Sequence, residues 1–227
     1  MNYKLFYAVS NGDKDAVSVL IKKGADLEAR TEEGLTALML AAQLGLTDVA
    51  KVLLDNGARI EARAELRGRT PLIMAVRYKR SDVAKLLVER GADVNAEESD
   101  GTTALAWAVQ NGQTAMVKYL IGHDADMEAK DTRIGFTPLM WAVSVGDADI
   151  VGLLVRHGAN VDAKNGNSEA PLLVAVENGE VGIAKILLEN GADARIKNKK
   201  GQDAKTVARK KGDRRLIRLF SDRVGKK

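Results

Sequence analysis

Few residues of this chain could do catalytic chemistry. Its 227 residues include two histidines and no cysteine, which excludes thiolate nucleophiles, disulfides and cysteine-ligated zinc. His123 and His157 stand at equivalent positions of a repeated pattern. Packed helices lie about 10 Å apart, so the two side chains are too distant to share a metal. We interpret both as helix-end residues whose imidazoles face the last carbonyl groups.

The carboxylates follow the same repeated pattern. Four aspartates close a Gly-Ala-Asp-like tripeptide, namely Asp26, Asp93, Asp126 and Asp193. A periodic placement predicts a structural role, such as accepting hydrogen bonds from loop amides in Asx turns. No Gly-Lys-Ser or Gly-Lys-Thr is present, so the chain has no P-loop. Because catalysis needs titratable groups that converge in one pocket, we expect no enzyme, no cofactor and no metal site.

The repeat itself predicts the architecture. The tripeptide begins at residues 24, 57, 91, 124, 158 and 191, and a period of 33 or 34 residues indicates a stack of small supersecondary units. A Thr-Pro-Leu-like segment follows each tripeptide, as at Thr70-Pro71-Leu72 and Thr137-Pro138-Leu139, and such a segment starts a helix. A second helix with apolar residues at helical spacing comes next. Each unit therefore reads as helix, turn, helix and projecting hairpin-like loop, and the fold class as an all-α repeat solenoid.

These motifs resemble the ankyrin repeat family over nearly the whole chain. The resemblance implies a single domain, 1–227, with terminal half-repeats at 1–30 and 198–227. The five full repeats are expected at 31–63, 64–97, 98–130, 131–164 and 165–197. Three departures predict local losses of stability: Lys79 replaces a helix-ending Gly, Asp124 replaces the Gly of the tripeptide, and Ala170 replaces the capping Thr. Asp tolerates the left-handed conformation better than most residues.

The resemblance also implies binding of another protein through the loop tips and the inward-facing first helices. The residues at these positions vary between copies, whereas the scaffold residues barely change. A contiguous exposed apolar patch often marks a contact site, and Tyr and Arg are enriched at interface hot spots. The candidate partner-binding residues are Leu35, Leu44, Leu66, Arg67, Arg69, Arg77, Tyr78, Arg133, Ile134, Phe136 and Val145. The alternative for Leu66 and Ile134 is local packing onto neighbouring loops.

Trp107 and Trp141 occupy one repeat position, where other copies carry Leu40, Met74 or Val174. This equivalence predicts that both indoles belong to the core between first helices. A small-molecule site beside the tryptophans, in a regulator or enzyme subunit, is the alternative function. A scaffold sequence without a native partner is a third.

The charge is distributed unevenly. The net charge is +4, but residues 195–227 hold 14 lysines and arginines against three aspartates. The basic end caps the stack with a polar outer face and is expected to bind polyanions weakly. Phe220 is its one aromatic residue, so no sequence-specific nucleic-acid site is expected. The sequence contains no run of 18 apolar residues, so it predicts no transmembrane segment. We expect a monomer in the cytoplasm.

Overall fold

A computed structural model describes residues 2–221 of the chain. Its contacts divide the chain into two compact units, Met1–Ala125 and Asp126–Lys227, and each is considered by itself. Both units consist of paired helices joined by long loops, and the described residues form no extended strand. The expected all-α repeat fold is confirmed.

The first unit contains four helix pairs. Their bounds are α1 Asn2–Ser10, α2 Lys14–Lys22, α3 Ala37–Leu44, α4 Thr47–Asp55, α5 Pro71–Arg77, α6 Ser81–Glu89, α7 Ala104–Gln110 and α8 Thr114–Ile121. The second unit contains three pairs within its described residues. Their bounds are α9 Pro138–Val145, α10 Ala148–Arg156, α11 Pro171–Asn178, α12 Val181–Glu189, α13 Ala204–Lys211 and α14 Arg214–Ser221.

The first helix of each inner pair begins where the sequence predicts. The hydroxyls of Thr36, Thr70 and Thr103 accept hydrogen bonds from backbone amides three residues ahead. Such caps contribute about 1 kcal/mol each. Ala170 makes no such bond at the start of α11. The predicted loss of a cap is therefore confirmed.

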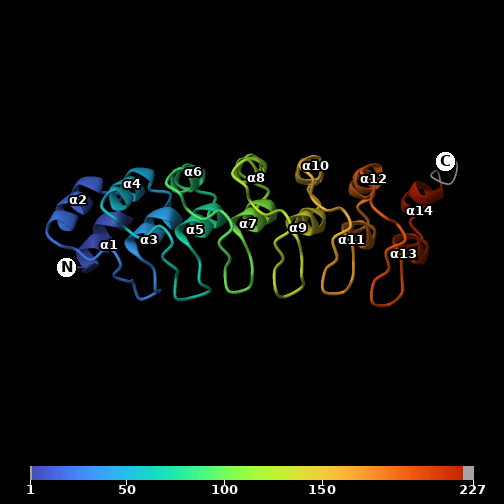
Figure 1. The fold of residues 1–227 in the computed structure, drawn as a ribbon, viewed down its shortest axis with the longest axis horizontal. Coiled ribbons are helices and arrows are strands. Elements are labelled where there is room, and N and C mark those ends of the chain that lie inside the picture. The colour runs from blue at the N-terminus through green and yellow to red at the C-terminus, as the bar shows by residue number, and fades with distance from the viewer. Residues whose placement is uncertain (1, 222–227) are drawn as a thin grey trace. The chain divides into compact units, whose positions relative to one another are not determined.

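The core of each unit lies between two layers of helices (Figure 1). In the first unit, α1, α3, α5 and α7 pack in one row and α2, α4 and α6 in another. The same leucine recurs in the interior of successive first helices, as Leu38, Leu72 and Leu105, each at most 1% exposed. In the second unit Leu139 and Leu172 take this place. One repeated sequence position therefore contributes a buried leucine to each of these first helices.

The loops are hairpin-like without forming regular strands. Backbone bonds close them, such as the amide of Ala64 donating to the carbonyl of Arg69 at 2.9 Å. Arginine side chains clip neighbouring loops together: the guanidinium of Arg30 donates to the carbonyls of Gly34 and Arg63. The predicted Asx turns are confirmed. Each of the four tripeptide aspartates accepts a hydrogen bond from the amide two residues ahead: Asp26, Asp93, Asp126 and Asp193.

Two departures from the repeat adopt the left-handed backbone that glycine takes elsewhere. Asp124 has φ 61° and Lys79 has φ 59°. The glycine equivalent to Asp124 in the preceding repeat, Gly91, has φ 84°. Because side chains disfavour this region, both residues hold strained positions that the surrounding repeats impose.

Candidate partner-binding surfaces

Exposed apolar side chains gather on the loops and at the ends of the first helices. Among the described residues, the large exposed apolar side chains on the loops and at the first-helix ends are Leu44, Leu66, Tyr78, Ile134 and Val145. All five were predicted. The inner second helices, α4, α6, α8, α10 and α12, carry none in the part of the chain that the structure describes. Leu66 is 70% exposed, so it does not fold back onto a neighbouring loop.

Two of the predicted residues are not available at the surface. Leu35 is 7% exposed, because its loop closes on Thr31: the Thr31 amide donates to the Leu35 carbonyl, and the Leu35 amide donates to the Thr31 hydroxyl. The side chain of Arg69 is 12% exposed and forms an ion pair with Glu98. The expectation of exposure is therefore wrong for both residues.

Glu98 organises a polar cluster in the first unit. Its side chain is fully buried. Its Oε1 accepts hydrogen bonds from Arg69 Nε at 3.0 Å and from Trp107 Nε1 at 2.6 Å. Its Oε2 has no hydrogen-bond partner within the described residues. The buried carboxylate thus holds both Arg69 and the indole in place.

Arg77 lies on the face of this indole. Its guanidinium carbon is 4.3 Å from the centroid of Trp107 and 5.9 Å from that of Tyr78. The backbone is held as well, since the amide of the Asn111 side chain donates to the Arg77 carbonyl at 3.0 Å. Cation–π contact of this kind fixes the position of a long, otherwise mobile side chain. We call Leu44, Leu66, Arg67, Arg77 and Tyr78 the Arg77 surface.

A tight turn displays the loop part of this surface. Arg67 and Gly68 have φ 68° and 65°, and the Arg67 carbonyl accepts the amide of Ser99 from the next loop at 2.9 Å. The Arg67 side chain lies 3.8 Å from Asp100. The turn directs Leu66 to solvent while its backbone stays tied to the neighbouring loop.

The equivalent loop of the second unit is held by a different set of hydrogen bonds. Asp131 accepts three backbone hydrogen bonds, from Arg133, Ile134 and Phe136, at 2.9–3.0 Å. Phe136 contacts Trp141 edge-on, with ring centroids 5.1 Å apart. We call Arg133, Ile134, Phe136 and Val145 the Ile134 surface, which is mainly apolar.

Both tryptophans are half-buried in their units. The prediction that both indoles belong to the core is therefore wrong, because each is only half-buried and lies at the edge of the core. The Trp141 indole nitrogen is buried and has no acceptor among the described residues, whereas that of Trp107 is bonded to Glu98.

The histidines have the predicted role at helix ends. The Nδ1 atoms of His123 and His157 lie 2.8 Å from the carbonyl oxygens of Tyr119 and Leu153. Residues 2–221 contain no cluster of three or more side chains able to hold a metal ion. No helix in this range is long and apolar enough to cross a membrane.

Comparison with known proteins decides the family. The family described as ankyrin repeats (3 copies) matches residues 5–98, 64–131, 105–198 and 146–223. The chain belongs to the ankyrin repeat family. Two ankyrin repeat proteins of Rickettsia felis, RF_p14 and RF_pd14, are each 45% identical to it over 49 residues. This stretch is 22% of this chain and 78% or 74% of theirs.

A solved structure extends the likeness to the whole fold. The ankyrin repeat domain of Bcl-3, a member of the IkappaB protein family, superimposes with a TM-score of 0.89 at 30% identity. The match covers 96% of this chain and 97% of that one. Ankyrin repeats generally act as protein interaction modules, and residues 2–221 of this chain have their fold.

The sequence contained a signal for the Glu98 cluster that reasoning on the ankyrin repeat missed. The residue that begins each repeat is acidic only in the two copies that carry tryptophan: Glu98 precedes Trp107, and Asp131 precedes Trp141. Other copies have Thr31, Ala64 or Asn165 there. This pairing suggested a contact between acid and indole, which the structure forms between Glu98 and Trp107 but not between Asp131 and Trp141.

Proposed function

We propose that this ankyrin repeat protein binds another protein through the Arg77 surface and the Ile134 surface. The observation that carries the proposal is the distribution of exposed apolar side chains. Among residues 2–221, five of the eight large exposed apolar side chains lie on loops and first-helix ends, and none lies on an inner second helix. The other three, Tyr3, Tyr7 and Val19, lie on the terminal pair α1 and α2. Exposed apolar groups that gather on the loops and first-helix ends of a unit mark a contact site on that unit.

Affinity purification from the native host tests this proposal. We would compare the wild type with a Leu66→Ser, Tyr78→Ser variant and an Ile134→Ser, Val145→Ser variant. The control is Tyr7→Ser, Val19→Ser, which removes equally exposed apolar groups from α1 and α2. We expect a partner that the wild type and the control retain and that at least one surface variant loses. Equal recovery by all four folded proteins would reject both surfaces.

The proposal includes three further statements. The protein acts without catalysis, since its titratable groups serve loops and helix ends. It works as a monomer. It resides in the cytoplasm, in keeping with a cysteine-free sequence.

A second, weaker binding activity is proposed for the basic end of the second unit. On α13 and α14 the apolar residues Leu216 and Phe220 are buried, while Arg209, Lys210, Arg214 and Arg218 are exposed. Residues 222–227, with three further basic groups, lie outside the described residues. Such an end attracts polyanions without selecting a sequence. Elution from heparin well below about 0.5 M salt is expected, because salt screens exposed charges. Retention beyond that concentration, or discrimination between DNA sequences, would contradict this statement.

A further inference from the structure

We propose that the Arg77 surface binds an acidic peptide segment, in which a carboxylate pairs with Arg77 and flanking apolar side chains contact Leu44 and Tyr78. This inference rests on the proposed function and names the chemistry of the partner.

Arg77 differs from the other well-placed arginines of the first unit. Arg30 and Arg63 bind loop carbonyls, Arg80 binds the Gln43 carbonyl at 3.0 Å, and Arg90 binds Asp55 at 2.8 Å. Within the described residues, the guanidinium of Arg77 has aromatic contacts but neither an ion pair nor a hydrogen bond. Its donors are therefore available to a ligand.

The guanidinium is also pre-organised. Trp107 supports it, and Glu98 fixes Trp107 through the indole N–H. A guanidinium stacked on an aromatic face keeps its in-plane N–H donors for a second partner, and the planar fork matches a carboxylate. Because the side chain is already ordered, binding loses little further conformational entropy.

The local charge favours an anion over a cation. Glu98 is the acidic group of the cluster, and Arg69 already neutralises it through a buried ion pair. Arg77 therefore adds an unbalanced positive charge beside partly apolar surroundings. Charge-assisted hydrogen bonds to a carboxylate are about twice as strong as neutral ones.

The neighbouring apolar groups set the length of the segment. Leu44 and Tyr78 occupy equivalent positions at the ends of α3 and α5, which pack against each other. Packed helices lie about 10 Å apart, a distance that about three residues of extended chain span. The expected segment has two apolar residues about three positions apart, with Asp or Glu beside the second.

Selection from a random dodecapeptide display library at physiological salt is the test. The bait is the full chain. Each enriched peptide is resynthesised together with a neutral variant in which Gln replaces Glu or Asn replaces Asp. Each peptide is titrated against the wild type, Arg77→Gln and Arg77→Lys. Arg90→Gln serves as the control. It also removes one arginine charge, but at a site on the second helices, where Arg90 pairs with Asp55. Circular dichroism melts confirm that all variants fold.

We expect enrichment of peptides with the acidic and apolar spacing described. Their affinity should fall about tenfold with Arg77→Gln or with the neutral peptide, and less with Arg77→Lys. The neutral peptide should lose no further affinity for Arg77→Gln, because the peptide change and the protein change remove the same contact. Arg90→Gln should leave affinity unchanged.

Peptides without an acidic residue, or acidic peptides that bind Arg77→Gln as well as the wild type, would overturn the inference. If such peptides lose affinity with Ile134→Ser, Val145→Ser, the proposed function stands and only the Arg77 assignment falls. Failure to enrich any peptide also overturns the assignment of a linear acidic segment. Affinity purification then decides the proposed function independently.

Discussion

Trp107 and Trp141 occupy the same position in two ankyrin repeats, yet they support different surfaces. In the first unit the indole N–H donates to Glu98 and the ring carries Arg77. In the second unit the indole N–H has no acceptor among the described residues, and the ring meets the edge of Phe136. One repeat presents a cation and the other an apolar face.

The acidic side chains of the two repeats differ by one methylene group, and their loops differ by one residue: the Glu98 amide donates to the Thr102 carbonyl, and the Asp131 amide to the Phe136 carbonyl. Asp131 is short enough to accept the amides of its own loop, and Asn165 and Asn198 do the same in later repeats. Glu98 is longer, and its carboxylate reaches Arg69 and Trp107 instead. The acid at the start of the repeat therefore orders its own loop in the second unit and the surface above the tryptophan in the first.

The largest expected effect is that of Glu98→Ala. The change leaves Arg69 and the Trp107 indole without their acceptor, and breaking a buried ion pair costs about 3–5 kcal/mol. Urea unfolding measures the loss. The control is Glu97→Ala, the exposed neighbour, for which surface substitutions cost within about 0.5 kcal/mol. Similar midpoints for the two variants would show that Glu98 does not hold the cluster.

Replacing each tryptophan by phenylalanine compares the two indoles directly. Trp107→Phe removes a hydrogen bond to a charged group, which is worth about 1.5–3 kcal/mol, whereas Trp141→Phe removes no such bond. We expect Trp107→Phe to be more destabilising by about 2 kcal/mol in chemical unfolding. An equal loss in both variants would contradict the assigned difference.

The left-handed position at the end of α8 gives a smaller effect of opposite sign. Asp124→Gly should stabilise the first unit by about 1 kcal/mol, because glycine adopts φ 61° without strain. The matched change Gly158→Asp, at φ 92° in the second unit, should destabilise by a similar amount. Thermal melts of both variants are the measurement. An unchanged or lower midpoint for Asp124→Gly would show that the aspartate is not strained.

The smallest effect concerns acid stability at one helix cap of the second unit. The inner first helices of the first unit are capped by threonines, which do not titrate, whereas Asp203 caps α13. The hydrogen bond with Thr206, helped by Lys197 and Lys205, lowers the pKa of Asp203 below its ordinary 3.8. Its contribution to stability is present above that value and is lost as the pH falls through the lowered pKa.

Asp203→Ser keeps a capping oxygen but removes the titration. Its unfolding midpoint should therefore decline less steeply between neutral and strongly acidic pH than that of the wild type. Parallel curves for the two proteins would show that this cap does not contribute to acid unfolding.

The fold could be predicted from the sequence because each rule is local and repeated. Thr70 and Pro71 start a helix through contacts within their own segment, whichever helix packs against it. Asp93 orders its own loop by accepting a hydrogen bond from the amide two residues ahead. Position placed Leu66 and Ile134 on the loops but left local packing open for both, and the structure shows both side chains exposed.

The site was less predictable because its contacts join residues from different segments. The side chain of Arg69 is mostly covered and pairs with Glu98 of the next loop, and that pairing has no signature within one repeat. Leu35 looked like a tip residue, but the closure of its loop by Thr31 buries it. Glu98 and Asp131 begin equivalent repeats, and pattern matching treats the two acids as equivalent. The structure shows that they differ, since Glu98 binds the tryptophan of its repeat and Asp131 does not.

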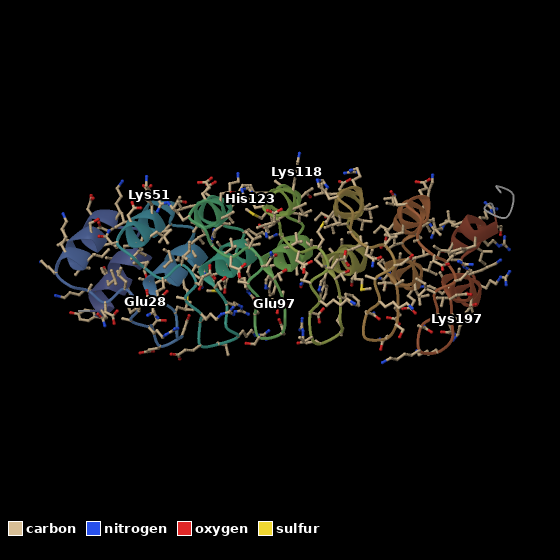
Figure 2. The ribbon with its side chains drawn as sticks, in the orientation of Figure 1. Glu28, Lys51, Glu97, Lys118, His123 and Lys197 are labelled. Carbon is tan, nitrogen blue, oxygen red and sulfur yellow. The ribbon has the colours of Figure 1, made fainter. Side chains whose placement is uncertain are left out.

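Site-specific photo-crosslinking in the native host tests the central claim most directly. Figure 2 places Lys51 and Lys118 on the second helices of the first unit, away from the loops that carry Glu28 and Glu97. A photoreactive residue would replace Leu66, Tyr78 or Ile134 in turn, and Lys51 or Lys118 as controls. The account predicts adducts with one partner from the first set and none from Lys51 or Lys118. Adducts confined to Lys51 and Lys118 would contradict it.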